Sequence, residues 1–153
     1  MRTIVATVIA TLLCTSVALA QNSSGPRKSL YDRLGGLPAI KAVVDDFVGN
    51  VARDKRINRY FANADIPRLK KLLVEQICQA SGGPCTYSGR DMKTTHRGMG
   101  IAGKQFDALV QDLGWSLRKF KVPAREQKEL VGLLAPMKKD IVERKSRTAA
   151  AGH

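Results

Sequence analysis

Histidine is scarce in this chain. One of its histidines is His96, which lies in the stretch MKTTHRGMGI at residues 92–101. The only other histidine is His153, the last residue. A lone histidine is a poor site for a bare zinc or copper ion, because such ions need three or four ligands. It can instead be the protein ligand of an iron whose other ligands come from a porphyrin. An ordinary histidine satisfied by hydrogen bonds is the alternative, and the residue alone leaves both open.

Cysteine is the second chemically distinctive residue type. Cys14 lies in the N-terminal apolar run, whereas Cys78 and Cys85 lie seven residues apart across Gly82-Gly83-Pro84. If the N-terminal run is a leader that is removed on export, Cys78 and Cys85 remain. Two cysteines in an exported chain permit a disulfide, but spacing alone cannot show that the two sulfurs meet. Two cysteines without clustered histidines do not favour a zinc site.

The N-terminus has the composition of a secretory signal peptide. Arg2 precedes an apolar run that ends in Ala18-Leu19-Ala20, so we expect residues 1–20 to be removed by cleavage after Ala20. The run is slightly short for an uncleaved membrane anchor, which is the alternative. We therefore expect an exported, periplasmic or secreted protein without stable membrane insertion after cleavage. Polar composition predicts flexible tails at 21–28 and 145–153, which leaves one domain at 29–144.

The chain is strongly basic, with a formal charge of +13, and Arg2 is the only charged residue of the leader. A basic surface can bind nucleic acid or an anionic membrane. Here the cations are scattered over all segments, and aromatic residues make up only 5%. We therefore expect no nucleic-acid partner, although a basic helical module that meets nucleic acid or membrane stays as a third class of function.

Helical periodicity dominates the rest of the sequence, and no strand pattern persists. Four apolar stripes recur at helical spacing, within residues 40–51, 69–77, 106–120 and 130–141. Asp65 is a plausible N-terminal cap of the second helix, and Pro136 should kink the last one. Two short helical pieces are expected around 30–34 and 91–97. Four such stripes must pack against one another, which predicts an all-α fold.

Six motifs, in one order and register, resemble the truncated haemoglobins, and more closely those of group I. They are SLYDRLGG (29–36), FVGNV (47–51), RYF (59–61), PRLK (67–70), GGPCTYSG (82–89) and MKTTHRGMGI (92–101). The resemblance covers about residues 29–141. It implies a truncated globin-like two-over-two helical sandwich, with haem b between the 65–80 helix and the later helices.

The resemblance also implies roles for individual residues. His96 would be the proximal ligand of the haem iron, and its second ring nitrogen would need an acceptor, most simply a backbone carbonyl upstream. Ordinary core packing would explain the remaining positions equally well. The side chains expected around the haem are Phe61, Leu69, Leu73, Ile77, Met92, Thr95, Ile101, Phe106, Leu109 and Leu134.

The chain departs from the family pattern on the distal side of the expected haem. Group I members often have a tyrosine where Val48 stands and a glutamine on the facing helix, where Leu69 and Leu73 stand here. Leu72 is apolar as well, and Gln76 is expected to point past the haem. A donor in this place stabilises bound oxygen by roughly 1–3 kcal/mol. Without one we expect five-coordinate ferrous iron, modest oxygen affinity and easy autoxidation.

The leading hypothesis is thus an exported haem protein that binds diatomic gases, namely oxygen and also CO and NO, for oxygen transport or gas sensing. An enzyme is the alternative, either a nitric oxide dioxygenase or a weak peroxidase, although such reactions usually need polar groups beside the iron-bound ligand. An electron-donating reductase would be a further partner, which the sequence does not identify. The absence of a CxxCH motif argues against haem attachment through two thioethers.

Overall fold

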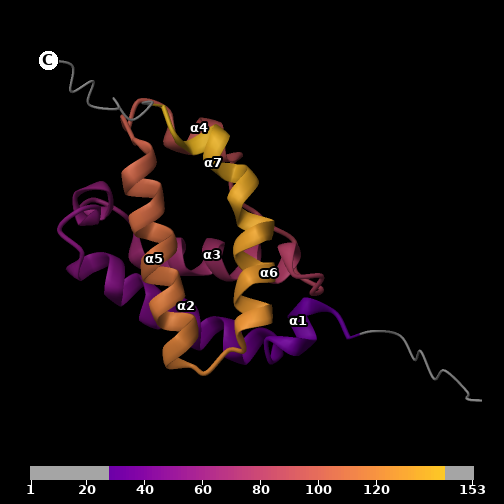
Figure 1. Ribbon diagram of the computed structural model, residues 1–153. Coiled ribbons are helices and arrows are strands. Elements are labelled where there is room, and N and C mark those ends of the chain that lie inside the picture. Colours follow the sequence, from indigo (N-terminus) through magenta and orange to yellow (C-terminus); the bar gives the residue numbers. More distant parts are fainter. Residues whose placement is uncertain (1–27, 144–153) are drawn as a thin grey trace, which may run out of the picture.

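The computed structural model describes residues 28–143, and the regular elements of this range are all helices (Figure 1). Five of them are longer or carry the expected site, and four are short connecting turns. In chain order they are α1 (Leu30–Arg33), α2 (Gly36–Arg53), η1 (Asn58–Phe61), α3 (Ile66–Ala80), α4 (Met92–His96), α5 (Gly103–Lys119), α6 (Ala124–Leu134), η2 (Ala135–Met137) and α7 (Lys138–Ile141).

Side-chain caps fix where the helices near the expected site begin. The carboxylate of Asp65 accepts a hydrogen bond from the backbone N–H of Arg68 at 3.0 Å, which confirms Asp65 as the cap of α3. Asp91 caps α4 in the same way, through the N–H of Thr94 at 2.8 Å. Each cap satisfies a backbone donor that the first helical turn leaves without a partner.

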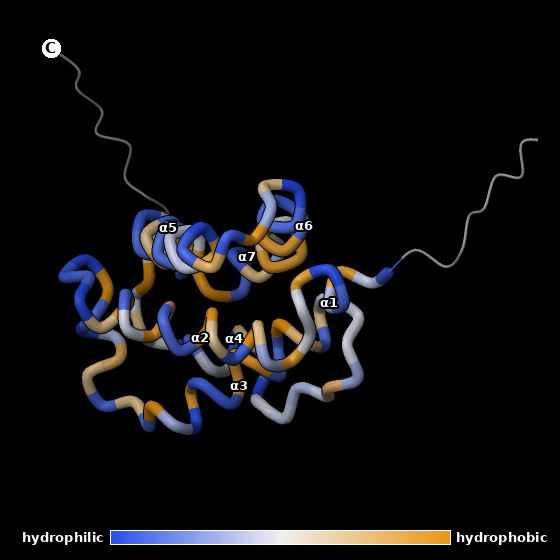
Figure 2. Tube along the Cα trace, turned by 90° about the horizontal axis from the view of Figure 1, so that it is seen from below, coloured by the Kyte–Doolittle hydropathy of each residue, from blue (hydrophilic) through white to orange (hydrophobic). Residues whose placement is uncertain are grey.

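The helices form two layers, as the view from below shows (Figure 2). One layer holds α2, α3 and α4, and the other holds α5, α6 and α7. Helix α2 packs against both α3 and α5, and so joins the layers. Its apolar stripe is buried around Val44, which is fully buried, and meets Leu117 of α5 and Leu130 of α6 in one core. This confirms the predicted all-α, two-over-two arrangement.

In the C-terminal layer, one feature agrees with the sequence prediction and another departs from it. Pro136 interrupts the last helix as predicted, because α6 ends at Leu134, η2 holds the proline, and α7 restarts at Lys138. Phe120 and Leu133 belong to the predicted stripes, yet they are 43% and 42% exposed. Phe120 is the C-terminal cap residue at which α5 ends, and Leu133 lies one residue before the end of α6.

The expected leader at residues 1–20 and the C-terminal tail at 145–153 lie outside the described residues, as does the tail at 21–28 except for Lys28. Within residues 28–143, no helix has the length and apolar character needed to cross a membrane.

Candidate haem site

His96 is the last residue of α4, a helix of only five residues. Its Nδ1 lies 2.8 Å from the carbonyl oxygen of Met92, one turn earlier. Because a carbonyl can only accept, Nδ1 carries the hydrogen and donates it, which leaves the Nε2 lone pair available to a metal ion. The backbone carbonyl expected upstream of His96 is therefore present, and it fixes both the tautomer and the tilt of the imidazole.

The imidazole borders two adjoining cavities between the helical layers, of about 190 and 210 Å³. Side chains of α3, α4, α5 and α7 border both of them, so together they form one elongated slot. Ten of the eleven site residues expected from sequence line the first cavity: Phe61, Leu69, Leu73, Ile77, Met92, Thr95, His96, Phe106, Leu109 and Leu134. The eleventh, Ile101, lines the second. The structure thus gathers all eleven, and their contact with haem stays a prediction.

In the wall that α2 and α3 contribute to the first cavity, the four distal positions compared with the family pattern above are all apolar. Val48 of α2 is 6% exposed, and its side chain borders the cavity. Leu69, Leu72 and Leu73 of α3 border the same cavity. These four side chains carry no hydrogen-bonding group, so none of them can stabilise a polar ligand.

Gln76 also lines the first cavity, and its orientation relative to the haem stays a prediction. Its Nε2 lies 3.5 Å from the sulfur of Met92 and 3.3 Å from that of Met137. The amide therefore reaches from α3 toward α4 and η2, and thioether sulfur is a weak acceptor. Seven residues separate Gln76 from Leu69, so helical spacing already places both on one face.

Tyr87 is a second cavity residue that the sequence did not single out for the lining. Its hydroxyl donates to the carbonyl oxygen of Arg90 at 3.1 Å, and burial raises the pKa of this phenol above its ordinary value. The Thr95 hydroxyl donates more weakly to the same carbonyl, at 3.4 Å. Both hydroxyls are thus engaged with the backbone just ahead of α4.

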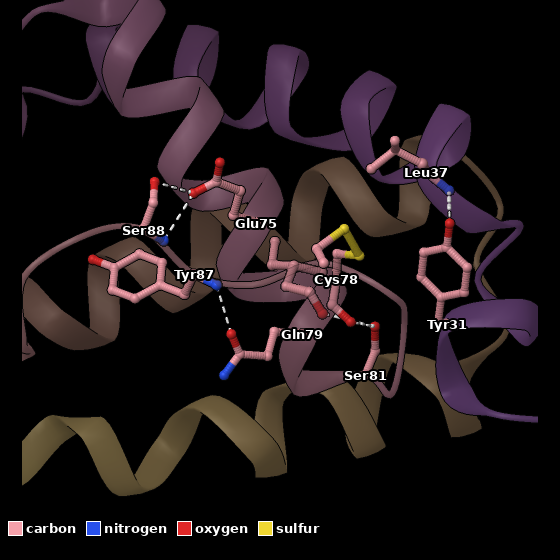
Figure 3. The surroundings of a disulfide bond; sticks show 10 residues. Tyr31, Leu37, Glu75, Cys78, Gln79, Ser81, Tyr87 and Ser88 are labelled. Carbon is pink, nitrogen blue, oxygen red and sulfur yellow. Dashed lines mark hydrogen bonds between the residues drawn. A yellow bond between two sulfur atoms is a disulfide. The ribbon is translucent and has the colours of Figure 1, made fainter.

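The loop between α3 and α4 is tied back onto α3 (Figure 3). A disulfide joins Cys78, which is fully buried, to Cys85, and so settles what spacing left open. The Ser88 N–H and hydroxyl both donate to Glu75, at 3.0 and 2.7 Å. Gly83 must be glycine here, since a Cβ would lie 2.7 Å from the Cys78 sulfur and 2.5 Å from the Tyr31 ring. These contacts fix the segment that leads into His96.

The donor set of the slot fits a porphyrin better than a bare metal ion. It presents one oriented imidazole and otherwise mainly apolar walls, and residues 28–143 hold no cluster of three or more side chains that could bind a metal ion. A porphyrin supplies the remaining iron ligands itself and needs a flat apolar site. The slot therefore suits haem, with His96 as its ligand to iron.

Comparisons with known proteins agree with this chemistry. Residues 29–143 match the family model of the bacterial-like globins. A group 1 truncated haemoglobin of Mycolicibacterium paratuberculosis is 34% identical over 123 residues, which cover 80% of this chain and 90% of the relative. A group 1 truncated haemoglobin of a Nostoc species is also 34% identical, covering 76% of this chain and 98% of the relative.

Solved structures give the same result. The truncated haemoglobin of Tetrahymena pyriformis in its Fe(III) form superposes with a TM-score of 0.74 at 29% identity, covering 76% of this chain and all of that one. The 2/2 haemoglobin of Synechococcus, with covalently attached haem, has a TM-score of 0.72 at 30% identity and the same coverage. This chain therefore belongs to the bacterial-like globin family, among the group 1 truncated haemoglobins, and its cofactor is haem.

Proposed function

We propose that the protein is an exported haem protein that binds oxygen reversibly, together with CO and NO, and serves oxygen transport or gas sensing. The observation that carries this proposal is the apolar wall of Val48, Leu69, Leu72 and Leu73, which borders the same cavity as the His96 imidazole. Such a site leaves room for a small gas molecule and supplies no acid or base from that wall.

His96 is the residue that holds the iron in this proposal. Haem bound in the slot would supply an iron atom that can bind a diatomic gas. The hydrogen bond from His96 Nδ1 to the Met92 carbonyl fixes the ring, and His96 would hold the iron through its other ring nitrogen. Leu69, Leu72 and Leu73 of α3 would offer the iron no second ligand, so we expect a five-coordinate ferrous state.

The same wall sets how firmly oxygen is held. A hydrogen bond to a ligand with partial negative charge contributes about 1.5–3 kcal/mol, and each 1.36 kcal/mol changes an equilibrium tenfold. Without that bond, oxygen leaves about ten- to a hundred-fold faster, whereas carbon monoxide, which carries less charge, is little affected. Gln76 is a side-chain donor on the same helix, and its amide is turned toward Met92 and Met137.

The enzyme alternative requires more polar chemistry than this wall offers. Nitric oxide dioxygenation and peroxidase turnover both gain from groups that stabilise charge or transfer protons beside the ligand. Tyr87 and Thr95 are the polar neighbours, and both donate to the Arg90 carbonyl. Their engagement favours binding over turnover.

Export is proposed from the leader sequence and is supported by the disulfide. Bonds such as Cys78–Cys85 persist mainly in oxidising compartments, including the periplasm. Cleavage near Ala20 would remove the apolar run of the leader. A reductase that returns the iron to its ferrous state is a further partner that this role requires.

Ligand kinetics and turnover assays separate the two functions. Flash photolysis of the ferrous, haem-loaded protein should give fast oxygen release and ordinary carbon monoxide binding. Nitric oxide dioxygenation, followed as nitrate formed from the oxygenated protein, should be slow compared with a Val48→Tyr variant measured side by side. Slow oxygen release together with rapid nitrate formation would replace the binding role by the enzyme.

A further inference from the structure

The helix that carries His96 cannot hold its own position. Five residues make little more than one turn, and helices this short are unstable in water without tertiary contacts. Asp91 caps its first turn, but this acts at the end away from His96. Among the other elements, α4 packs chiefly against α7 near the end of the described chain. The histidine end of α4 is therefore supported chiefly from this C-terminal segment.

A single carboxylate makes that connection. Glu143 accepts a hydrogen bond from the backbone N–H of Gly98 at 2.6 Å through one oxygen, and from that of Gly100 at 2.7 Å through the other. Its own N–H donates to the Ile101 carbonyl at 2.9 Å. Three hydrogen bonds thus join the turn just after His96 to Glu143, a residue more than 40 positions away in sequence, and we call this set of contacts the Glu143 grip.

The glycines are what allow this grip. Gly98 has a φ of 81° and Gly100 a φ of 63°, both in the left-handed region that residues with a Cβ seldom adopt. Alternation of such residues turns successive N–H groups toward one point and forms a concave site for an anion. Bonds from backbone N–H groups to a charged acceptor are about twice as strong as neutral ones.

Side-chain packing connects the 98–100 turn to the haem slot. Ile101 and Ile141 are buried together with Phe106, and Met92 packs against the same small cluster. Ile101, Ile141 and Phe106 also line the cavity beside His96. Movement of the 98–100 turn would thus shift both the wall and the imidazole.

We propose that Glu143 is a positioning residue for the iron ligand: its carboxylate, held by Gly98 and Gly100, sets the orientation and strain of His96. The inference rests on the proposed haem site and adds to it a residue outside the cavity. Loss of the grip lets α4 tilt, which weakens the bond from the imidazole to the iron and speeds haem loss.

The test compares Glu143→Gln with Glu129→Gln in the haem-loaded protein. Glutamine keeps the size but presents an N–H₂ group to one of the two backbone donors. Glu129 is a matched control, because it makes an ion pair with Arg33 between α1 and α6. We expect Glu143→Gln to change the iron–histidine stretching vibration of the ferrous protein and to speed haem loss about tenfold or more. Exchange of the Gly98 and Gly100 amides should accelerate by a similar factor, with no change in Glu129→Gln.

Gly98→Ala addresses the same grip from its other side. A Cβ at Gly98 meets nothing within 4 Å, so alanine acts only through its unfavourable φ. If both residues work through one contact, the double variant should lose haem little faster than the more affected single variant. Gly98→Ala also serves if Glu143→Gln fails to fold by circular dichroism.

The outcomes are distinct. An unchanged iron–histidine vibration in both single variants would overturn the inference, even if their melting temperatures fall, because a purely structural residue would do no more than that. A wild-type chain that takes up no haem would refute the proposed function itself.

Discussion

Val48→Tyr is the change that most directly probes the apolar distal wall. Val48 is 6% exposed and borders both the haem cavity and a neighbouring cavity of about 340 Å³, so a larger ring has space to enter. Its hydroxyl would add the donor that the wall lacks. One hydrogen bond to a charged acceptor contributes about 1.5–3 kcal/mol, so oxygen release should slow by about ten- to a hundred-fold.

The matched control is Val48→Phe, which adds the same ring without the hydroxyl. Oxygen and carbon monoxide release would be measured by flash photolysis and ligand replacement in wild type and both variants. We expect oxygen release to slow in Val48→Tyr alone, while carbon monoxide release changes less than threefold or so, since it gains little from a donor. Equal oxygen release in Val48→Tyr and Val48→Phe, with wild type already slow, would refute the reasoning and point to Gln76 or Tyr87 as an existing donor.

Three further perturbations follow from the structure. His96→Gly should abolish stoichiometric haem binding, and added imidazole should restore the Soret band; haem retention without imidazole would contradict the role of His96. Replacing Cys78 and Cys85 by serine should lower the free energy of unfolding by about 2 kcal/mol, measured in urea at equal ionic strength, and an unchanged midpoint would show that the loop is held by its hydrogen bonds alone. Asp112 is fully buried, and both carboxylate oxygens lack a hydrogen bond. Burial above all raises its pKa over the ordinary 3.8, so the folded state holds this proton more tightly than the unfolded state, and stability is lost as the pH rises above that value. Asp112→Asn should therefore flatten the fall in melting temperature as the pH rises above 3.8 and raise the melting temperature at neutral pH; a less stable variant at neutral pH would mean that Arg56, whose guanidinium lies 3.9 Å from the carboxylate, compensates the charged form.

Local patterns were sufficient for most of the fold. Apolar residues at helical spacing predicted the four main helices, because burying a stripe requires that period whatever the partner. Asp65 and Pro136 act through the backbone beside them, so their effects were predictable from position alone. Phe120 and Leu133 were predicted within buried stripes but are exposed, since coverage by the opposite layer depends on how the layers cross.

The site was predictable where it depended on one residue and its neighbours. The resemblance implied a backbone acceptor upstream of His96, and the Met92 carbonyl, four residues earlier on the same helix, is that acceptor. Gln76 was not predicted as part of the cavity lining, although its position on the Leu69 face could have been deduced from helical geometry. Glu143 had no such signal, because its contacts with Gly98 and Gly100 join residues 45 and 43 positions apart.

Absorption spectroscopy of the mature protein, residues 21–153, tests the haem site most directly. The spectrum would be recorded with haem supplied, in the oxidised, reduced and carbon monoxide-bound reduced states. We predict one haem per chain, a five-coordinate ferrous spectrum, and a Soret band that shifts sharply on adding carbon monoxide. A six-coordinate ferrous spectrum would contradict the apolar distal wall, and the absence of stoichiometric haem would contradict the site as a whole.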